Sequence, residues 1–138
     1  MTLTGLPELL YRAYNDHDAD AVARLYASDA THEDIAQGKP KRGPAEIASG
    51  LSKFFGWFPD AHWSAQAQIA DPNGSVAITY LMTATLRGQM GPILPRGQKV
   101  SLQGVHVLRT REGAILCSRD YWDAATFQRQ LNTPQTGD

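Results

Sequence analysis

The sequence has little cysteine and no marked excess of charge of either sign. Its 138 residues include a single cysteine, Cys117, so no disulfide can form within the chain. The chain carries 13 basic and 14 acidic residues, for a net charge of −1. This balance gives no electrostatic reason to expect nucleic acid or an anionic membrane as a partner.

Long apolar runs are also missing. No segment approaches the length of a membrane-spanning helix. The first residues, MTLTGLPELLYR, lack the cationic segment and the uninterrupted apolar run of a signal peptide. A protein of the reducing cytoplasm is therefore expected.

Motifs for common cofactors and nucleophiles are absent as well. The sequence contains no nucleophile elbow, phosphate loop, dinucleotide-binding fingerprint or zinc-binding helix motif. His32, His106 and Asp120 offer a two-histidine, one-carboxylate metal site. This alternative is disfavoured, because no pair has a recognised ligand spacing and each residue comes from a different strand. We expect neither a cofactor nor a metal.

The hydrophobic pattern changes from helical to strand-like at about residue 60. Four helices are predicted. The first, third and fourth cover residues 6–15, 44–56 and 124–131. The second is capped by Asp16 or Asp18 and carries Ala21, Val22, Leu25 and Tyr26. Strands are predicted at 30–35, 61–69, 76–86, 99–110 and 114–123, with a loop at 88–97. Helices that precede an antiparallel sheet are typical of an α+β domain. We expect one domain over residues 1–131 and a flexible tail at 132–138.

Alternation along the last two strands places a carboxylate and an imidazole on one face. Asp120 shares its face with Leu116, Ser118 and Trp122, and His106 lies on an otherwise apolar face. A three-residue hairpin loop puts His106 diagonal to Asp120, and a register shifted by two puts them opposite each other. Both arrangements assume that no bulge changes the parity. Such a pair in apolar surroundings is either a structural pair or a site in use.

Three other polar residues are candidates of less weight. His32 can enter the pocket from the early strand, although a lone strand histidine is often incidental. Asp123 has the opposite parity to Asp120 and is expected to cap the last helix. Cys117 also has the opposite parity, so a nucleophilic role is not expected.

Several motifs together resemble one protein family. They are the segments Tyr14–Asp18, Leu25–Ala30, Arg42–Ile47, Phe58–Asp60, Gly88–Lys99 and Gly104–Arg109, followed by Ser118-Arg119-Asp120-Tyr121-Trp122-Asp123. Over nearly its whole length the chain resembles the SnoaL-like polyketide cyclases of the ketosteroid isomerase and nuclear-transport-factor-2-like superfamily. The resemblance implies a conical, curved mixed sheet wrapped around the N-terminal helices, in a cystatin-like barrel with an interior pocket.

The resemblance also implies roles for individual residues. Asp120 matches the acid/base aspartate of the Arg-Asp-aromatic stretch, and His106 matches a histidine of the penultimate strand. His32 stands where the family has a pocket asparagine. The expected substrate-binding residues are His32, Trp63, Met82, Leu86, Met90, Leu102, Gly104 and Trp122.

These observations predict a cofactor-independent enzyme of the cyclase or isomerase type. Asp120 is expected to abstract a proton next to a carbonyl and to promote intramolecular aldol closure of a small, hydrophobic, polyketide-like substrate. His106 is expected to bind the substrate carbonyl or to orient Asp120. An epoxide hydrolase or cofactor-free hydroxylase that uses Asp34 as a second carboxylate is one alternative. A non-catalytic small-molecule binding module is the other.

The outer face of the sheet suggests self-association. It is mixed and β-branched, and it carries Thr79, Leu81, Thr83, Thr85, Ser101, Gln103, Val105, Val107, Cys117 and Tyr121. A broad face of this kind usually marks an interaction surface, and two-fold symmetry is the commonest arrangement of homo-oligomers. We expect a homodimer joined through this face.

Overall fold

The computed structural model describes residues 2–133, and Met1 and residues 134–138 lie outside the described part. The helices are α1 (Gly5–Asn15), α2 (Ala19–Ala23), α3 (Gly43–Trp57) and α4 (Ala124–Asn132). The strands are β1 (Tyr26–Asp34), β2 (Lys41–Arg42), β3 (His62–Ala70), β4 (Ser75–Thr85), β5 (Lys99–Arg111) and β6 (Ala114–Trp122). In the described part no helix is long and apolar enough to cross a membrane.

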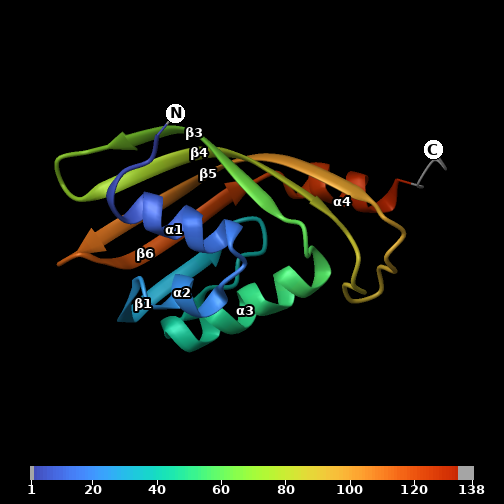
Figure 1. The fold of residues 1–138 in the computed structure, drawn as a ribbon, viewed down its shortest axis with the longest axis horizontal. Helices are drawn as coiled ribbons and strands as arrows, with labels where there is room; N and C mark the ends of the chain where they lie inside the picture. Colours follow the sequence, from blue (N-terminus) through green and yellow to red (C-terminus); the bar gives the residue numbers. More distant parts are fainter. Residues whose placement is uncertain (1, 134–138) are drawn as a thin grey trace.

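The strands form one sheet with the order β2-β1-β6-β5-β4-β3. β1 runs parallel to β6, and the other neighbouring pairs are antiparallel. The sheet curves over α1, α2 and α3, and it stays open between β2 and β3 (Figure 1). The predicted α+β fold with a curved mixed sheet around the N-terminal helices is confirmed, with an open sheet in place of a closed barrel.

The second helix is shorter than its apolar spacing indicated. Asp18 caps α2, because its side chain accepts a hydrogen bond of 3.0 Å from the backbone N–H of Ala21. The helix ends at Ala23, and β1 begins at Tyr26, which pairs with Ile115 of β6. The prediction that Leu25 and Tyr26 belong to this helix is therefore wrong, because strand pairing outweighs the local helical period.

A bulge divides β6 into two halves. Arg109 pairs with Cys117 but Thr110 pairs with Ile115, so β6 holds one extra residue at Leu116. Ile115 and Ser118 are both fully buried as a result. The predicted parity is wrong for Ile115 and Leu116. Beyond the bulge Asp120 lies directly opposite His106. Of the two registers predicted from the sequence, this is the one shifted by two residues.

The last helix closes one end of the sheet. Asp123 caps α4 as predicted, accepting a hydrogen bond of 3.1 Å from the backbone N–H of Ala125. Arg96 and Gln98, which precede β5, donate hydrogen bonds to the carbonyl of Leu131 at 3.2 and 3.1 Å. α4 extends to Asn132, the first residue of the predicted tail, and residues 134–138 of that prediction lie outside the described part.

Candidate active site

A cavity of about 470 Å³ lies between the concave face of the sheet and α3. Its floor is formed by β1, β4, β5 and β6, and α3 forms its outer wall. Five of the predicted apolar binding residues line it: Trp63, Met82, Met90, Leu102 and Trp122. His32, Asp34, Tyr80 and Asp120 supply polar groups to the same wall. An apolar cavity with few convergent polar groups is the usual form of a small-molecule site.

Two predicted binding residues do not line this cavity. Leu86 is fully buried in the hydrophobic core. Gly104 faces Tyr80 of β4, its register partner, and a Cβ atom at position 104 would collide with the Tyr80 hydroxyl and ring. Gly104 therefore makes room for a polar side chain rather than for the substrate.

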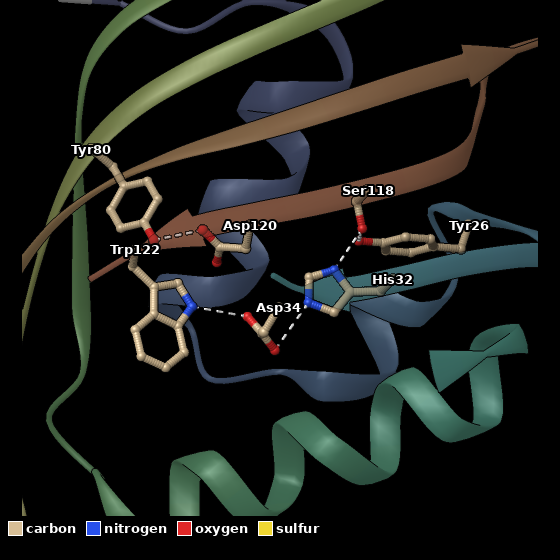
Figure 2. Close-up of polar contacts among 7 residues, drawn as sticks. All are labelled: Tyr26, His32, Asp34, Tyr80, Ser118, Asp120 and Trp122. Atoms are coloured by element: carbon tan, nitrogen blue, oxygen red, sulfur yellow. Dashed lines mark hydrogen bonds and ion pairs between the residues drawn. The ribbon is translucent and has the colours of Figure 1, made fainter. Parts of the chain in front are cut away.

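Asp120 is held by a tyrosine. The hydroxyl of Tyr80 donates a hydrogen bond of 2.6 Å to Oδ1 of Asp120 (Figure 2). Burial, and next the negative charge of Asp120, raise the pKa of Tyr80, so the phenol stays a neutral donor. The lone glycine opposite an inward-facing tyrosine was the sequence signal for this contact, which the sequence analysis missed.

The protonation of Asp120 is shifted toward neutral pH. Burial is the largest cause, and the negative charge of Asp34 adds to it. The hydrogen bond from Tyr80 and the charge of His32 oppose these effects. The net result raises the pKa of Asp120 from 3.8 to about 7. A carboxyl group with this pKa can both take and return a proton near neutral pH.

Asp34 is a second carboxylate in the cavity wall. It is the register partner of Asp120 across the parallel β1–β6 pair. Its Oδ1 accepts a hydrogen bond of 3.2 Å from the indole N–H of Trp122, and its Oδ2 lies 3.5 Å from Nε2 of His32 (Figure 2). Burial acts to raise the pKa of Asp34, but these contacts and the charges of His32 and Lys41 outweigh it and lower the pKa. The pKa values of the two neighbouring carboxyl groups are therefore shifted in opposite directions, with that of Asp34 lowered and that of Asp120 raised.

His32 is the centre of a hydrogen-bonded chain. Its Nδ1 lies 2.6 Å from Oγ of Ser118, which in turn lies 2.7 Å from the hydroxyl of Tyr26 (Figure 2). Histidine, serine and aspartate in contact suggest a hydrolase triad, but Ser118 is fully buried and does not line the cavity. Its hydroxyl is thus not placed to attack a substrate. These hydrogen bonds instead fix the ring of His32 and, through it, the carboxylate of Asp34.

His106 lies behind the cavity wall. It is 1% exposed and does not line the cavity. Its ring packs on Tyr14 at a centroid distance of 6.0 Å and meets His32 edge-on at 5.9 Å. Burial, aided by the charge of His32, lowers the pKa of His106 to about 3, so the imidazole is neutral near pH 7.

The predicted roles of His106 find no contact to support them. In the described residues its Nε2 has no hydrogen-bond partner, and the hydrogen bond that Asp120 accepts comes from Tyr80. Tyr80 therefore orients Asp120, and His106 supports the rings that line the cavity. Within residues 2–133 no group of three or more histidine, cysteine, aspartate or glutamate side chains is arranged to hold a metal.

Solved structures with the same fold carry varied descriptions. A hypothetical protein from Catenulispora acidiphila with a ketosteroid isomerase-like fold, in complex with trimethylamine, is 20% identical with a TM-score of 0.82, covering 96% of each chain. AclR of Streptomyces galilaeus, a candidate hydroxylase, is 22% identical with a TM-score of 0.78, covering 94% of this chain and 95% of that one. A candidate polyketide cyclase from Xanthomonas campestris is 24% identical with a TM-score of 0.79, covering 92% and 94%.

At these identities the structures establish the fold alone. No curated protein sequence is significantly similar to the chain. The model of one protein family, SnoaL-like polyketide cyclase, matches residues 6–131, which include every strand and both carboxylates of the cavity. The chain belongs to the SnoaL-like polyketide cyclase family.

Proposed function

We propose that the chain is a cofactor-independent cyclase that uses Asp120 as general acid and base on a polyketide-like substrate. The observation that carries this proposal is a cavity-facing carboxyl group with a pKa of about 7, held by the hydroxyl of Tyr80. Perturbed carboxyl groups in apolar cavities are typical of acid–base catalysts. The same reasoning applies to ketosteroid isomerase, in which carboxyl groups near an apolar steroid site act as base and as hydrogen-bond donor.

The reaction begins with removal of a proton from a carbon between two carbonyl groups. The Asp120 carboxylate takes this proton, and the C–H electron pair becomes the enolate. The enolate carbon attacks a second carbonyl carbon of the same molecule, which forms the ring C–C bond and leaves an alkoxide. Asp120 returns its proton to the alkoxide, so the reaction is redox-neutral. The flanking carbonyls already acidify the carbon, and general acid–base catalysis supplies about 10²–10⁴-fold.

The remaining site residues hold substrate and base in place. Trp63, Met82 and Trp122 offer an apolar, largely aromatic surface to a flat polyketide. His32 contributes to the wall beside them and steadies Asp34. Tyr80 keeps Asp120 in one orientation.

The test replaces Asp120 and compares cyclisation of aromatic polyketide substrates. Asp120→Asn keeps an acceptor for Tyr80 but cannot take the proton, and turnover is expected to fall at least about 10²-fold. Asp123→Asn is the matched control, because this carboxylate lies outside the cavity and asparagine caps a helix equally well. Equal turnover by wild type and Asp120→Asn would refute the proposal.

A second candidate is hydration of an epoxide in the same cavity. The observation that favours it is the pair Asp34 and Asp120, of which one is held ionised and the other protonates near pH 7. Such a pair can activate water and protonate a leaving oxygen. Incorporation of ¹⁸O from labelled water into the product distinguishes it, since aldol closure incorporates none. A binding module without activity would retain ligand affinity and show no turnover with either substrate class.

The assembly is proposed to be a homodimer of a cytoplasmic protein. The outer sheet face remains partly exposed at Thr79, Leu81, Val105 and Val107, and Tyr121 is 41% exposed. The apolar side chains of α4, Phe127 and Leu131, are buried in the core, and Gln130 hydrogen-bonds the backbone of Ser101 near the start of β5. Sedimentation equilibrium near micromolar concentration tests the dimer, and a single 15.1 kDa species would contradict it.

A further inference from the structure

One rim of the cavity carries two lysines. Lys41 of β2 and Lys53 of α3 both line it, whereas Asp34 and Asp120 lie on its floor. The cavity therefore has an anionic region where the chemistry is proposed and a cationic region near its outer wall. A substrate that spans both regions would meet charge of opposite sign at its two ends.

The position of Lys41 is defined by the fold. Lys41 is the register partner of His32 across the antiparallel β1–β2 pair, so both side chains project from the same face of the sheet, toward the cavity. Its aliphatic part lies across α3 at Gly50, where a Cβ atom would collide with Cε of the lysine. Because Gly50 has no side chain, the aliphatic part of Lys41 can pack directly against the backbone of α3. A side chain held in this way loses less conformational entropy on binding an anion.

Neither lysine forms an ion pair within the described residues, although the charge of Lys41 helps to lower the pKa of Asp34. In the described residues the ion pairs are Arg12–Glu8, His32–Asp34 and Arg111–Asp29, none of which involves Lys41 or Lys53. Glu46 lies on the same rim, but its Oε1 accepts a hydrogen bond of 3.0 Å from the backbone N–H of Arg42. Together the two lysines and Glu46 leave one net positive charge at the rim. That charge matches a singly charged anion, such as a carboxylate.

We propose that Lys41 and Lys53 form a subsite for a carboxylate group of the substrate. The inference rests on the proposed function and narrows its substrate class to polyketide-like acids, with the acidic carbon at Asp120 and the carboxylate at the rim. Lys41 makes the principal contact, because it is partly buried and lies against α3 at Gly50. Lys53 is exposed and adds a weaker, salt-sensitive contribution.

Binding of a matched pair of probes tests the subsite. The pair is para-acetoacetylbenzoate and its methyl ester, which share the acidic carbon and differ in the carboxylate. Quenching of tryptophan fluorescence reports binding, because Trp57, Trp63 and Trp122 line the cavity. The acid is expected to bind about 5–10-fold more tightly than the ester, and this preference should weaken at high salt.

Three lysine variants give the comparison. Lys41→Met is expected to abolish most of the preference for the acid while leaving ester affinity unchanged, and Lys53→Met to reduce it about twofold. Lys99→Met, which removes an exposed lysine outside the cavity, is the matched control and should change neither affinity. Unchanged ester binding shows that each variant is folded. Equal affinity of wild type for acid and ester, no binding of the acid, or a preference that survives both cavity substitutions would each overturn the subsite.

These outcomes are separable from those of the proposed function. If the lysines govern acid binding but Asp120→Asn leaves turnover intact, the subsite stands and the mechanism fails. If turnover depends on Asp120 and wild type binds acid and ester alike, the mechanism stands and the subsite fails.

Discussion

Replacing Asp34 by asparagine should make Asp120 a weaker base. Neighbouring strands lie about 4.8 Å apart, so two carboxylates at paired positions on one face are about 5–6 Å apart. At an effective dielectric constant of about 20, two unit charges at this distance repel by about 3 kcal/mol. The charge of His32 compensates part of the repulsion. We take a net effect of about 1.4 kcal/mol, which lowers the pKa of Asp120 by about one pH unit.

The sign of this effect predicts two changes in the pH–rate profile. Asp120 must be ionised to accept the proton, so the acidic limb of kcat/KM should move from a midpoint of about 7 to about 6. A base weaker by about one pH unit should also lower the plateau at high pH by about threefold. The Asp34→Asn substitution keeps an acceptor for the indole of Trp122 at this position, so the cavity wall should be preserved.

The assay is steady-state cyclisation between about pH 5 and pH 9, with Glu33→Gln as the matched control. Glu33 is adjacent in β1 but has the opposite parity, and it does not line the cavity. Its substitution removes the same charge and should leave the midpoint unchanged. A midpoint that stays at about 7 in Asp34→Asn, or that moves upward, would refute the electrostatic coupling between the two carboxylates.

Three further outcomes are expected. Gly104→Ala should displace the ring of Tyr80 from Asp120 and lower kcat at least about tenfold, measured beside a thermal melt to confirm folding. Asp120→Asn should raise the midpoint of thermal unfolding at pH 8 but not at pH 4, because folding raises the pKa of Asp120 from 3.8 to about 7, so stability is lost as pH rises between these two values and the penalty is complete above pH 7. His106→Phe should reduce the loss of stability between about pH 6.5 and pH 3, since the lowered pKa of His106 penalises folding by up to about 1.4 kcal/mol per pH unit as the unfolded state gains a proton; an equal fall of the urea midpoint with decreasing pH in both proteins would contradict this.

Local patterns predicted most of the fold and part of the site. Alternation in β4, β5 and β6 placed Tyr80, His106 and Asp120 on the inner face of the sheet, and the turn residues marked the loops between the strands. The start of β1 escaped prediction because parallel pairing with a strand about 90 residues later leaves no local signal. The bulge at Leu116 escaped prediction because the prediction assumed unbroken alternation, and one extra residue in β6 reverses the parity on either side of it.

The partners of each site residue depended on contacts between distant strands. The hydrogen bond from Tyr80 to Asp120 and the chain from Ser118 through His32 to Asp34 join residues of different strands. Parity shows that such residues share a face but not which atoms meet. Sequence reasoning therefore named Asp120 and His106 as partners, whereas depth within the wall separates His106 from the cavity.

The bulge at Leu116 also bears on how the β5–β6 hairpin tolerates change in length. It lies between the hairpin turn and the half of β6 that carries Ser118, Asp120 and Trp122, and it already takes up one unpaired residue. A one-residue deletion near Glu112 can be absorbed there by loss of the bulge, so Asp120 need not rotate to the outer face. The bulge thus lets the hairpin turn lose a residue while the end of β6 that carries Asp120 keeps its register.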